Sequence, residues 1–453
     1  MFKKILIANR GEIAVRIIRT CRDMGIISVA VYSEADRDSL HVQIADESIC
    51  IGGAHAHESY LNIDRIISAA LVSGAQAIHP GFGFLAENSN FVSKCESFGI
   101  AFIGPKSGTM QEMGDKIVAR TIAHSADVPI TPGSVSEVKN HADALNTAEQ
   151  IGFPLMVKAA AGGGGRGIRK VENKSELKTA FDAAKNEAIA CFGDGRLYIE
   201  KYLKNPRHIE IQILADGHGN VIHLFDRDCT IQRRHQKMIE EAPSSFIDDF
   251  VRNEMGKCAV KIAKRCNYIN AGTVEFLVDA NKNFYFCEMN TRIQVEHPIT
   301  EEIIGIDIVK EQIKIAHGEK LNLMQKDIKI NGCAMECRIN AEDPNNGFAP
   351  CVGTIEEMHQ PGGIGIRVDS GVYQGYTIPP FYDSMIAKLI VTADTRENCI
   401  LRMKRAISEY LFYGVTTNID FHISVLNNED FVRGSYGTDF CNEMLLNSDN
   451  KQK

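Results

Sequence analysis

The stretch GTVEFLVDANKNFYFCEMN, residues 272–290, carries the most structural information in this sequence, because it has the pattern of a β-hairpin with opposed acidic residues. Two apolar runs flank a polar turn segment, as two paired antiparallel strands do. With a two-residue turn at Asn281 and Lys282, Glu275 and Glu288 face each other with their Cβ atoms about 5 Å apart. Asn290 lies two residues beyond Glu288, so its side chain points to the same face.

Two opposed carboxylates repel each other unless a cation lies between them. Oxygen ligands of this kind suit Mg²⁺, with phosphate oxygens completing an octahedron. The alternative is a solvent-facing edge strand that tolerates like charges, but apolar neighbours such as Phe276 and Phe286 argue against full exposure. We therefore expect Glu275, Glu288 and Asn290 to hold a metal ion.

The residues after the hairpin continue the polar pattern, because Arg292, Gln294 and Glu296 alternate along an extended segment. An arginine beside a backbone N–H can bind a small planar anion bidentately, and a neighbouring carboxylate can accept a proton. An Arg–Glu pair on a strand is often only a salt bridge. The adjacent metal site favours the functional interpretation.

The run KAAAGGGGRG, residues 158–167, holds four consecutive glycines after Lys158. A glycine-rich loop lets backbone N–H groups close around phosphate oxygens. The Walker A pattern does not fit, because the lysine precedes the glycines and the loop joins two predicted strands. The run alone leaves two interpretations, a flap over phosphates or a surface linker without a ligand.

The amino-terminal segments KKILIAN (3–9), GEIAVRIIRTCRDMG (11–25) and IISVAVY (26–32) predict strand, helix and strand. Such a βαβ unit predicts a parallel sheet with a right-handed crossover. The first turn, NRGEIA, lacks the dinucleotide fingerprint, which disfavours a nicotinamide enzyme. Antiparallel strands are expected from residue 207 onward, and the polar tail 447–453 is expected to fray.

Composition excludes several classes of protein. The 453 residues suggest about three domains, and the net charge of −8 without a basic tract disfavours nucleic acid as a partner. No stretch predicts a signal peptide or a membrane span. The 13 cysteines form no CxxC pair, so we expect reduced, mostly buried thiols in a cytoplasmic protein, and structural zinc is disfavoured.

Lys158, the glycine flap and the Glu275–Glu288–Asn290 set, in this order along the chain, resemble the ATP-grasp superfamily. Further motifs narrow the resemblance to the biotin carboxylases, over residues 2 to 445: ANRGEIA (8–14), HPGFGFLAEN (79–88), RDCTIQRRHQKMIEEAP (227–243), EMNTRIQVEHPITE (288–301) and CRINAEDP (337–344). Each motif alone is weak, whereas the ordered set is specific.

The resemblance implies a fold of α/β and α+β class with three domains. These are a Rossmann-like domain (1–114), an ATP-grasp core (115–330) whose mobile glycine-rich lid spans about 131–203, and a carboxyl-terminal α+β domain (331–446). It also implies a reaction in which ATP phosphorylates bicarbonate to carboxyphosphate. Carboxyphosphate then yields CO₂ and phosphate, and biotin is carboxylated at N1′. Mg²⁺ or Mn²⁺ is the implied metal.

The resemblance also implies a role for individual residues. Glu275, Glu288 and Asn290 match the metal ligands, and Lys237 is similar to the lysine that reaches the reacting phosphate. Arg292, Gln294 and the Val295 backbone match the bicarbonate site, Glu296 the base, and Arg338 the arginine that holds the biotin ureido oxygen. The implied ATP-binding residues are Lys116, Lys158, Gly163, Gly164, Gly165, Glu200, Lys201, Leu203, His208, Gln232, His235 and Leu277.

The chain has no A-M-K-M biotinylation motif, so the resemblance implies biotin on a separate carrier protein, together with carboxyltransferase subunits. It looks like the biotin carboxylase subunit of an acetyl-CoA carboxylase in fatty acid synthesis, and a subunit of a split pyruvate or other acyl-CoA carboxylase is the alternative. Another ATP-grasp ligase or an inactive ATP-binding regulator fits the motifs less well. A homodimer is expected, with Arg16, Arg19 and Arg367 at its surface.

Three residues depart from the family pattern or need a separate interpretation. Phe82 replaces a common tyrosine, and Ala161 replaces a glycine found in some members. Cys229 lies among the site motifs, and we interpret it as a packed residue rather than a nucleophile.

Overall fold

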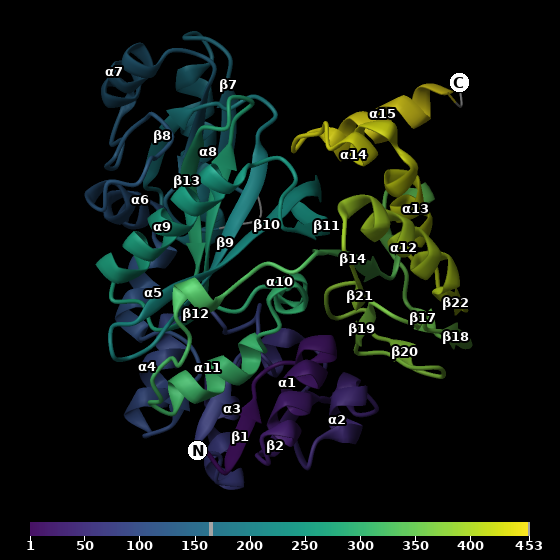
Figure 1. Ribbon diagram of the computed structural model, residues 1–453. Helices are drawn as coiled ribbons and strands as arrows, with labels where there is room; N and C mark the ends of the chain where they lie inside the picture. Colours follow the sequence, from purple (N-terminus) through teal and green to yellow (C-terminus); the bar gives the residue numbers. More distant parts are fainter. Residues whose placement is uncertain (163–165, 452–453) are drawn as a thin grey trace.

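The amino-terminal layer is a parallel sheet in the computed structural model, which describes residues 1–162 and 166–451 (Figure 1). Its described strands are β1 (Lys4–Ile7), β2 (Ile27–Ser33), β3 (Glu47–Gly52), β4 (Ala77–His79) and β5 (Ala101–Phe102). They lie in the order β3-β2-β1-β4-β5, and each neighbouring pair is parallel. This confirms the parallel sheet predicted from the amino-terminal sequence.

Helices cover both faces of this sheet because the side chains of a strand alternate between its faces. Ile5 and Ile7 of β1 pack in one apolar core with Ile13 and Ile17, whereas Leu6 packs in the core on the other face. The helices of this region are α1 (Gly11–Asp23), α2 (Leu40–Ile44), α3 (Ile63–Ser73), α4 (Ser89–Ser97) and α5 (Ser107–Gly114).

A small antiparallel sheet forms the layer that the sequence analysis calls the lid. Its described strands are β6 (Leu155–Ala159), β7 (Ile168–Val171) and β8 (Leu197–Lys201), in the order β7-β6-β8. The helices α7 (His141–Ile151) and α8 (Leu177–Phe192) pack on this sheet, and α6 (Lys116–Ser125), which precedes it, packs against β13 of the large sheet described next. The glycine run falls between the paired strands β6 and β7, as predicted. Gly163, Gly164 and Gly165 lie outside the described residues.

Eight of the described strands form one large sheet, in the order β13-β12-β9-β10-β11-β14-β21-β19. They are β9 (Arg207–Ala215), β10 (Val221–Arg233), β11 (Gln236–Ala242), β12 (Asn270–Val278), β13 (Phe284–Asn290), β14 (Cys333–Asn340), β19 (Ile366–Ser370) and β21 (Met385–Ala393). Because β11 pairs with β14, this sheet continues past residue 331, the predicted domain boundary. The domain ranges therefore stay predictions.

The hairpin of β12 and β13 has the predicted pair and a different turn. Glu275 pairs with Glu288, but the register shifts by one residue beyond them, so that Phe276 pairs with Phe286 and Cys287 forms a bulge. The connection spans residues 279–283. The two-residue turn predicted at 281–282 is therefore wrong, and the bulge restores the opposition of the two glutamates.

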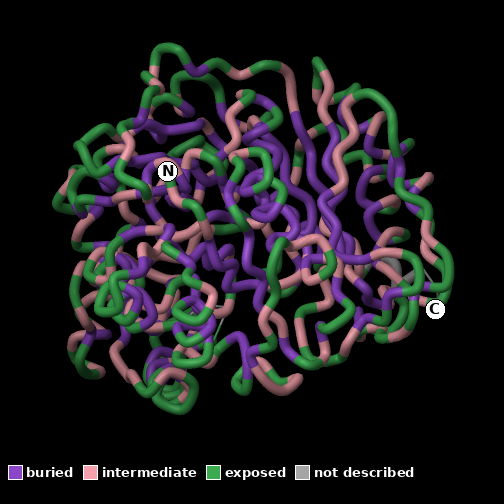
Figure 2. Tube along the Cα trace, turned by 90° about the horizontal axis from the view of Figure 1, so that it is seen from below, coloured by how far each residue is buried: buried purple, intermediate pink, exposed green. Residues whose placement is uncertain are grey.

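Helices and short strands complete the fold. They are α9 (Asp249–Arg265), α10 (His297–Ile304), α11 (Ile308–Ala316), α12 (Arg396–Glu409), α13 (Ile419–Asn427), α14 (Glu429–Arg433), α15 (Phe440–Lys451), β15 (Glu342–Asp343), β16 (Ala349–Pro350), β17 (Gly353–Thr354), β18 (Glu357–His359), β20 (Thr377–Ile378) and β22 (Leu411–Tyr413). Buried segments run through the interior of the molecule, with exposed loops around them (Figure 2). The backbone of α15 continues to Lys451, where a frayed tail is predicted. No described helix combines the length and apolarity needed to cross a membrane.

Candidate active site

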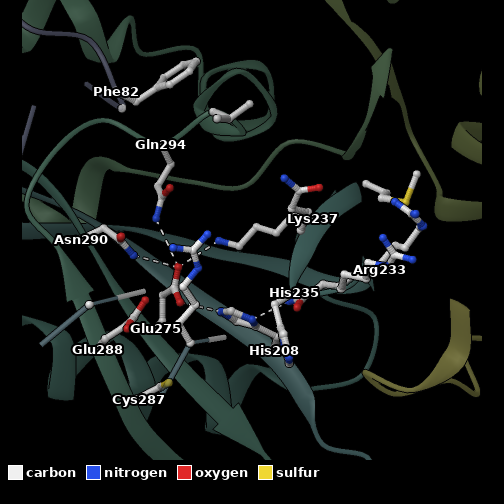
Figure 3. Close-up of a pocket in the computed structure, with 18 of the residues that line it drawn as sticks. Phe82, His208, Arg233, His235, Lys237, Glu275, Cys287, Glu288, Asn290 and Gln294 are labelled. Carbon is white, nitrogen blue, oxygen red and sulfur yellow. Dashed lines mark hydrogen bonds and ion pairs between the residues drawn. The ribbon is translucent and has the colours of Figure 1, made fainter. Parts of the chain in front are cut away.

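A cavity of about 990 Å³ lies where the three regions of the fold meet (Figure 3). Asn9 and Phe82 line it from the amino-terminal region, Lys158 and Ala161 from the lid, and Arg338 from β14. Most predicted site residues line this one cavity: Lys116, Lys158, Glu200, Lys201, Leu203, His208, Gln232, His235, Lys237, Glu275, Leu277, Glu288, Asn290, Arg292, Gln294, Val295 and Arg338. The residues predicted from the sequence therefore lie around one cavity, and the role of each residue stays a prediction.

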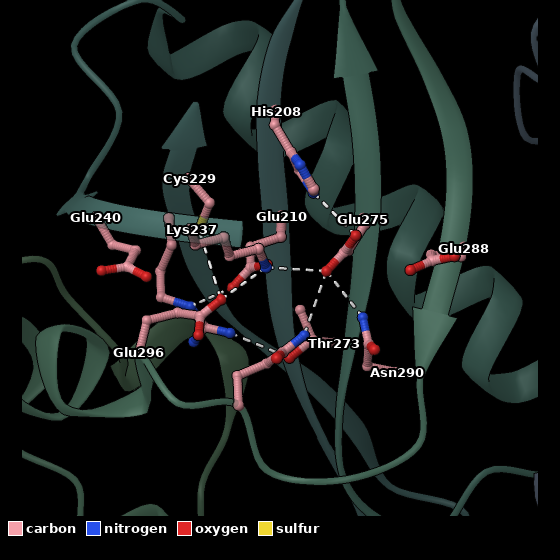
Figure 4. Close-up of polar contacts among 12 residues, drawn as sticks. His208, Glu210, Cys229, Lys237, Glu240, Thr273, Glu275, Glu288, Asn290 and Glu296 are labelled. Carbon is pink, nitrogen blue, oxygen red and sulfur yellow. Dashed lines mark hydrogen bonds and ion pairs between the residues drawn. The ribbon is translucent and has the colours of Figure 1, made fainter. Parts of the chain in front are cut away.

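Glu275 is the centre of a polar network on β12 (Figure 4). Its carboxylate accepts hydrogen bonds from Lys237 (3.0 Å), Asn290 (2.8 Å) and Gln294 (3.3 Å), and His208 Nε2 lies 2.9 Å away. Burial alone would raise the pKa of Glu275, but Lys237 and His208 outweigh burial and hold that pKa well below its ordinary value. Glu275 is therefore a permanent anion in the cavity wall.

Lys237 lies among three carboxylates, which face it from neighbouring strands and from the segment before α10. Its Nζ contacts Glu210 at 2.6 Å, Glu275 at 3.0 Å and Glu296 at 2.7 Å. Burial lowers the pKa of a lysine, but these carboxylates outweigh burial, and the pKa of Lys237 is raised well above its ordinary value. The cavity thus contains a fixed ammonium group beside the predicted metal ligands.

Two further lysines line the cavity from α6 and β6, each facing a carboxylate. Lys116, the first residue of α6, forms an ion pair with Glu288, and Lys158, on β6, forms an ion pair with Glu200. Burial acts to lower the pKa of both lysines, and the paired carboxylates raise it above the ordinary value. Both groups are cations that can exchange a carboxylate for a phosphate oxygen.

Arg292 is held by groups on either side of its guanidinium. Its Nε donates to Glu87 at 2.9 Å, and its other nitrogens donate to Asn290 at 3.0 Å and to Gln294 at 2.8 Å. Glu87 also accepts from the backbone N–H of Thr291 at 3.0 Å. Sequence reasoning did not select Glu87, and its only signal is its place within the motif HPGFGFLAEN.

Glu296 differs from the other predicted site residues, because it is not among the described residues that line the cavity. Its side chain is fully buried and contacts Lys237 at 2.7 Å and Arg338 at 2.9 Å. Burial would raise the pKa of Glu296, but Lys237 and Arg338 outweigh burial and hold that pKa well below its ordinary value. Proton uptake therefore neutralises Glu296 and weakens its ion pairs with Lys237 and Arg338.

Cys229 Sγ lies 3.6 Å from a Glu296 oxygen, and the residue is fully buried. Burial raises the pKa of this thiol well above its ordinary value. A protonated thiol is a poor nucleophile, so burial agrees with a packed Cys229, and the absence of a nucleophilic role stays an interpretation.

Arg338, on β14, links two buried acids at the wall of the cavity. Its Nε donates to Glu240 at 2.6 Å, and an Nη donates to Glu296 at 2.9 Å. Burial is the main cause that raises the pKa of Glu240, to about 7, although Arg338 acts to lower it. Sequence reasoning missed Glu240, because only the pairing of β11 with β14 places it beside Arg338.

The arginines predicted at the dimer surface differ in exposure. Arg16 is buried, and its guanidinium contacts Glu301 at 2.7 Å and Asp307 at 2.8 Å within the chain. Arg367 contacts the same Glu301 at 2.9 Å, whereas Arg19 is exposed. Arg16 therefore joins α1 to α10 within the chain, and the place of these arginines at a dimer surface stays a prediction.

Three family models together match most of the chain. The family described as "Biotin carboxylase, N-terminal domain" matches residues 1–110, "Carbamoyl-phosphate synthase L chain, ATP binding domain" matches 115–324, and "Biotin carboxylase C-terminal domain" matches 336–443. The ATP-binding match agrees with the ATP-grasp core expected from the sequence.

Individual relatives match over nearly their full length. Biotin carboxylase 1 of Bacillus subtilis is 53% identical over 97% of this chain and 98% of its own. A pyruvate carboxylase subunit of Methanothermobacter thermautotrophicus is 56% identical over 98% of this chain and 90% of its own. A solved structure, the biotin carboxylase domain dimer of Hydrogenobacter thermophilus 2-oxoglutarate carboxylase with MgADP, ADP and bicarbonate, has a TM-score of 0.94, with 51% identity over 98% of each chain.

Proposed function

The chain belongs to the biotin carboxylase family, and from this premise we propose that it uses ATP and bicarbonate to carboxylate biotin on a separate carrier protein, by way of carboxyphosphate. Membership in the family makes it an ATP-dependent ligase. The observation that carries the proposal is that one cavity is lined by Lys116, Lys158, the pair Glu275 and Glu288, Arg292 and Arg338.

The phosphates of ATP lie between Lys116 and Lys158, and the remaining ATP-binding residues surround the nucleotide. The donor set of Glu275, Glu288 and Asn290 fits Mg²⁺, because it offers two carboxylates and an amide oxygen on one face of a hairpin. When bound, Mg²⁺ neutralises charge on the transferred phosphoryl group. We propose that Mn²⁺ can replace Mg²⁺ at this site.

Bicarbonate lies against Arg292, with Gln294 and the Val295 backbone beside it. Glu87 orients the guanidinium of Arg292 from one side, so that this group is already in position when the anion binds. Glu296 accepts the bicarbonate proton as its contacts to Lys237 and Arg338 rearrange. Deprotonation makes bicarbonate a better nucleophile toward the γ-phosphate, and the nearby ammonium of Lys237 stabilises the negative charge of the transferred group.

Biotin enters at the Arg338 end of the cavity. The guanidinium stabilises the ureido oxygen as it acquires enolate character, and this is a fixed positive donor where charge develops. We propose that biotin arrives on a carrier protein and leaves to a carboxyltransferase partner, because the chain belongs to the biotin carboxylase family.

We propose acetyl-CoA as the final acceptor, so that the protein performs the first half-reaction of fatty acid synthesis as a cytoplasmic homodimer. This choice rests on the resemblance described from the sequence, because the name of the Bacillus subtilis relative, biotin carboxylase 1, specifies no acceptor. The second candidate is pyruvate, because a relative that is 56% identical is named as part of a pyruvate carboxylase. None of the cavity groups assigned here recognises an acyl acceptor, so the partner subunits decide between them.

The test is transfer of labelled bicarbonate. With ATP, Mg²⁺ and the carrier protein from the same organism, label is expected on the carrier, and addition of the carboxyltransferase should move it to acetyl-CoA. Transfer to pyruvate instead would select the second candidate. Absence of label on any biotinylated carrier would contradict both.

A further inference from the structure

A row of charged residues crosses the part of the large sheet that lies behind the cavity. Arg338 on β14 pairs with Lys388 on β21, and Lys388 pairs with Asp369 on β19. The next row, which includes Cys337 and Leu389, lies on the other face and belongs to the apolar core. One face of this sheet is therefore apolar, while the face toward α10 and α1 carries ionisable groups.

Lys388 joins three parts of the fold although its side chain is fully buried. Its Nζ donates to the backbone carbonyl of Val295 at 2.8 Å and lies 3.2 Å from Glu12 at the start of α1. A buried ammonium is costly unless acids and acceptors surround it. Its position therefore calls for a reason beyond packing.

The charges around Lys388 keep it ionised. Burial acts to lower its pKa, but Glu12, Glu336 and Asp369 outweigh burial and raise the pKa above its ordinary value. Both oxygens of Glu336 are buried and lack a hydrogen-bond partner among the described residues. Burial raises the pKa of Glu12 to about 7 and that of Glu336 well above its ordinary value, whereas Arg367 and Lys388 outweigh burial and lower the pKa of Asp369. Asp369 is thus the acid that stays ionised beside Lys388, while the hydrogen bond of the ammonium goes to the carbonyl of Val295.

The Val295 carbonyl belongs to the segment that carries the bicarbonate groups. Gln294 precedes it and Glu296 follows it, and this segment connects β13 to α10. A peptide plane is rigid, so fixing the carbonyl of Val295 fixes the orientation of the amide that follows. The same sheet row that presents Arg338 therefore also anchors this segment.

We propose that Lys388 is a positioning residue for bicarbonate: its ammonium fixes the Val295 carbonyl and, through it, the backbone between Gln294 and Glu296. The inference rests on the proposed function, which places bicarbonate at this segment. Lys388 contacts no reacting group. Its pairing with Glu12 ties the position of the segment to α1 of the amino-terminal region.

The test is steady-state kinetics of Lys388→Met, which removes the ammonium and keeps a side chain of similar length. Loss of one charge-assisted hydrogen bond predicts a rise of about tenfold in the KM for bicarbonate. The KM for ATP should stay unchanged. Because the substitution leaves Glu12 without its cation, Lys388→Met is also combined with Glu12→Gln, and the double variant is compared with Glu12→Gln alone. The double variant should be more stable to heat than Lys388→Met alone. Its KM for bicarbonate should stay raised relative to that of Glu12→Gln.

Arg396→Met is the matched control, because Arg396 neutralises the buried acid Glu241 at 2.5 Å in the same sheet region and does not line the cavity. It should lower thermal stability without changing the KM for bicarbonate. The inference is overturned if the double variant has the bicarbonate KM of Glu12→Gln alone, or if the KM for ATP rises by the same factor.

A further variant, Gln294→Ala, separates this inference from the proposed function. A raised bicarbonate KM in Gln294→Ala but not in Lys388→Met refutes only the role of Lys388. An unchanged KM in both variants refutes the placement of bicarbonate, and the role of Lys388 fails with it.

Discussion

Replacing Lys237 with methionine removes the one ammonium shared by Glu210, Glu275 and Glu296. Taking away one partner of a buried ion pair typically costs about 3–5 kcal/mol, because the remaining charge is left without compensation. Unfolding entropy of about 2.1 cal/mol/K per residue, over 453 residues, converts this loss to a fall of about 3–5 °C in the melting temperature.

The pH dependence of this loss follows from the pKa values. In the wild type, the pKa values of Glu275 and Glu296 lie well below their ordinary values, so these acids stabilise the fold above the unfolded pKa of about 4.3 and stop doing so as the pH falls. Without Lys237 their pKa values rise, and the folded variant binds protons that the unfolded chain does not. The gap in stability should therefore be widest near pH 8 and narrow toward pH 5.5.

The assay is thermal unfolding of wild type, Lys237→Met and Lys178→Met at several pH values. Lys178 is an exposed residue of α8, and its substitution should leave the melting temperature unchanged. A gap for Lys237→Met that is constant with pH, or that widens toward pH 5.5, would refute the assignment of Lys237 as the shared counter-ion.

Two further predictions concern Glu87, which contacts Arg292, and Glu288, a proposed metal ligand. Glu87→Gln weakens the charged hydrogen bond that orients Arg292, so it should raise the KM for bicarbonate about three- to tenfold while the KM for ATP stays unchanged. A change in the KM for ATP alone would contradict the position proposed for Arg292. Glu288→Gln removes a carboxylate ligand and should raise the Mg²⁺ concentration needed for half-maximal ADP release by about tenfold or more. An unchanged Mg²⁺ titration would remove Glu288 from the metal site.

Alternation within one hairpin made the acidic pair predictable. Glu275 and Glu288 oppose each other as the sequence indicates, since the side chains of a strand alternate over short distances. The turn was predicted wrongly, because the bulge at Cys287 changes the register without any glycine or proline to signal it. The correct pair thus depended on an extra residue that the sequence did not reveal.

Contacts between distant segments could not be predicted. Glu87 and Arg292 are 205 positions apart, and Lys388 and Val295 are 93 positions apart, so only the packing of separate regions brings them together. The burial of Arg16 has the same origin, since its acidic partners lie on and just after α10. Glu296 was placed in the correct cluster, but its full burial behind Lys237 and Arg338 depends on the β11–β14 pairing.

The most direct test of the proposed reaction is ADP release with Mg²⁺ and bicarbonate, measured with and without free biotin, in wild type and Arg338→Ala. Biotin should stimulate the wild type clearly, and the variant should lose this stimulation while both keep a slow, biotin-independent ATPase. This result would place Arg338 at the biotin step. Equal rates in the wild type with and without biotin and bicarbonate would contradict the proposed reaction.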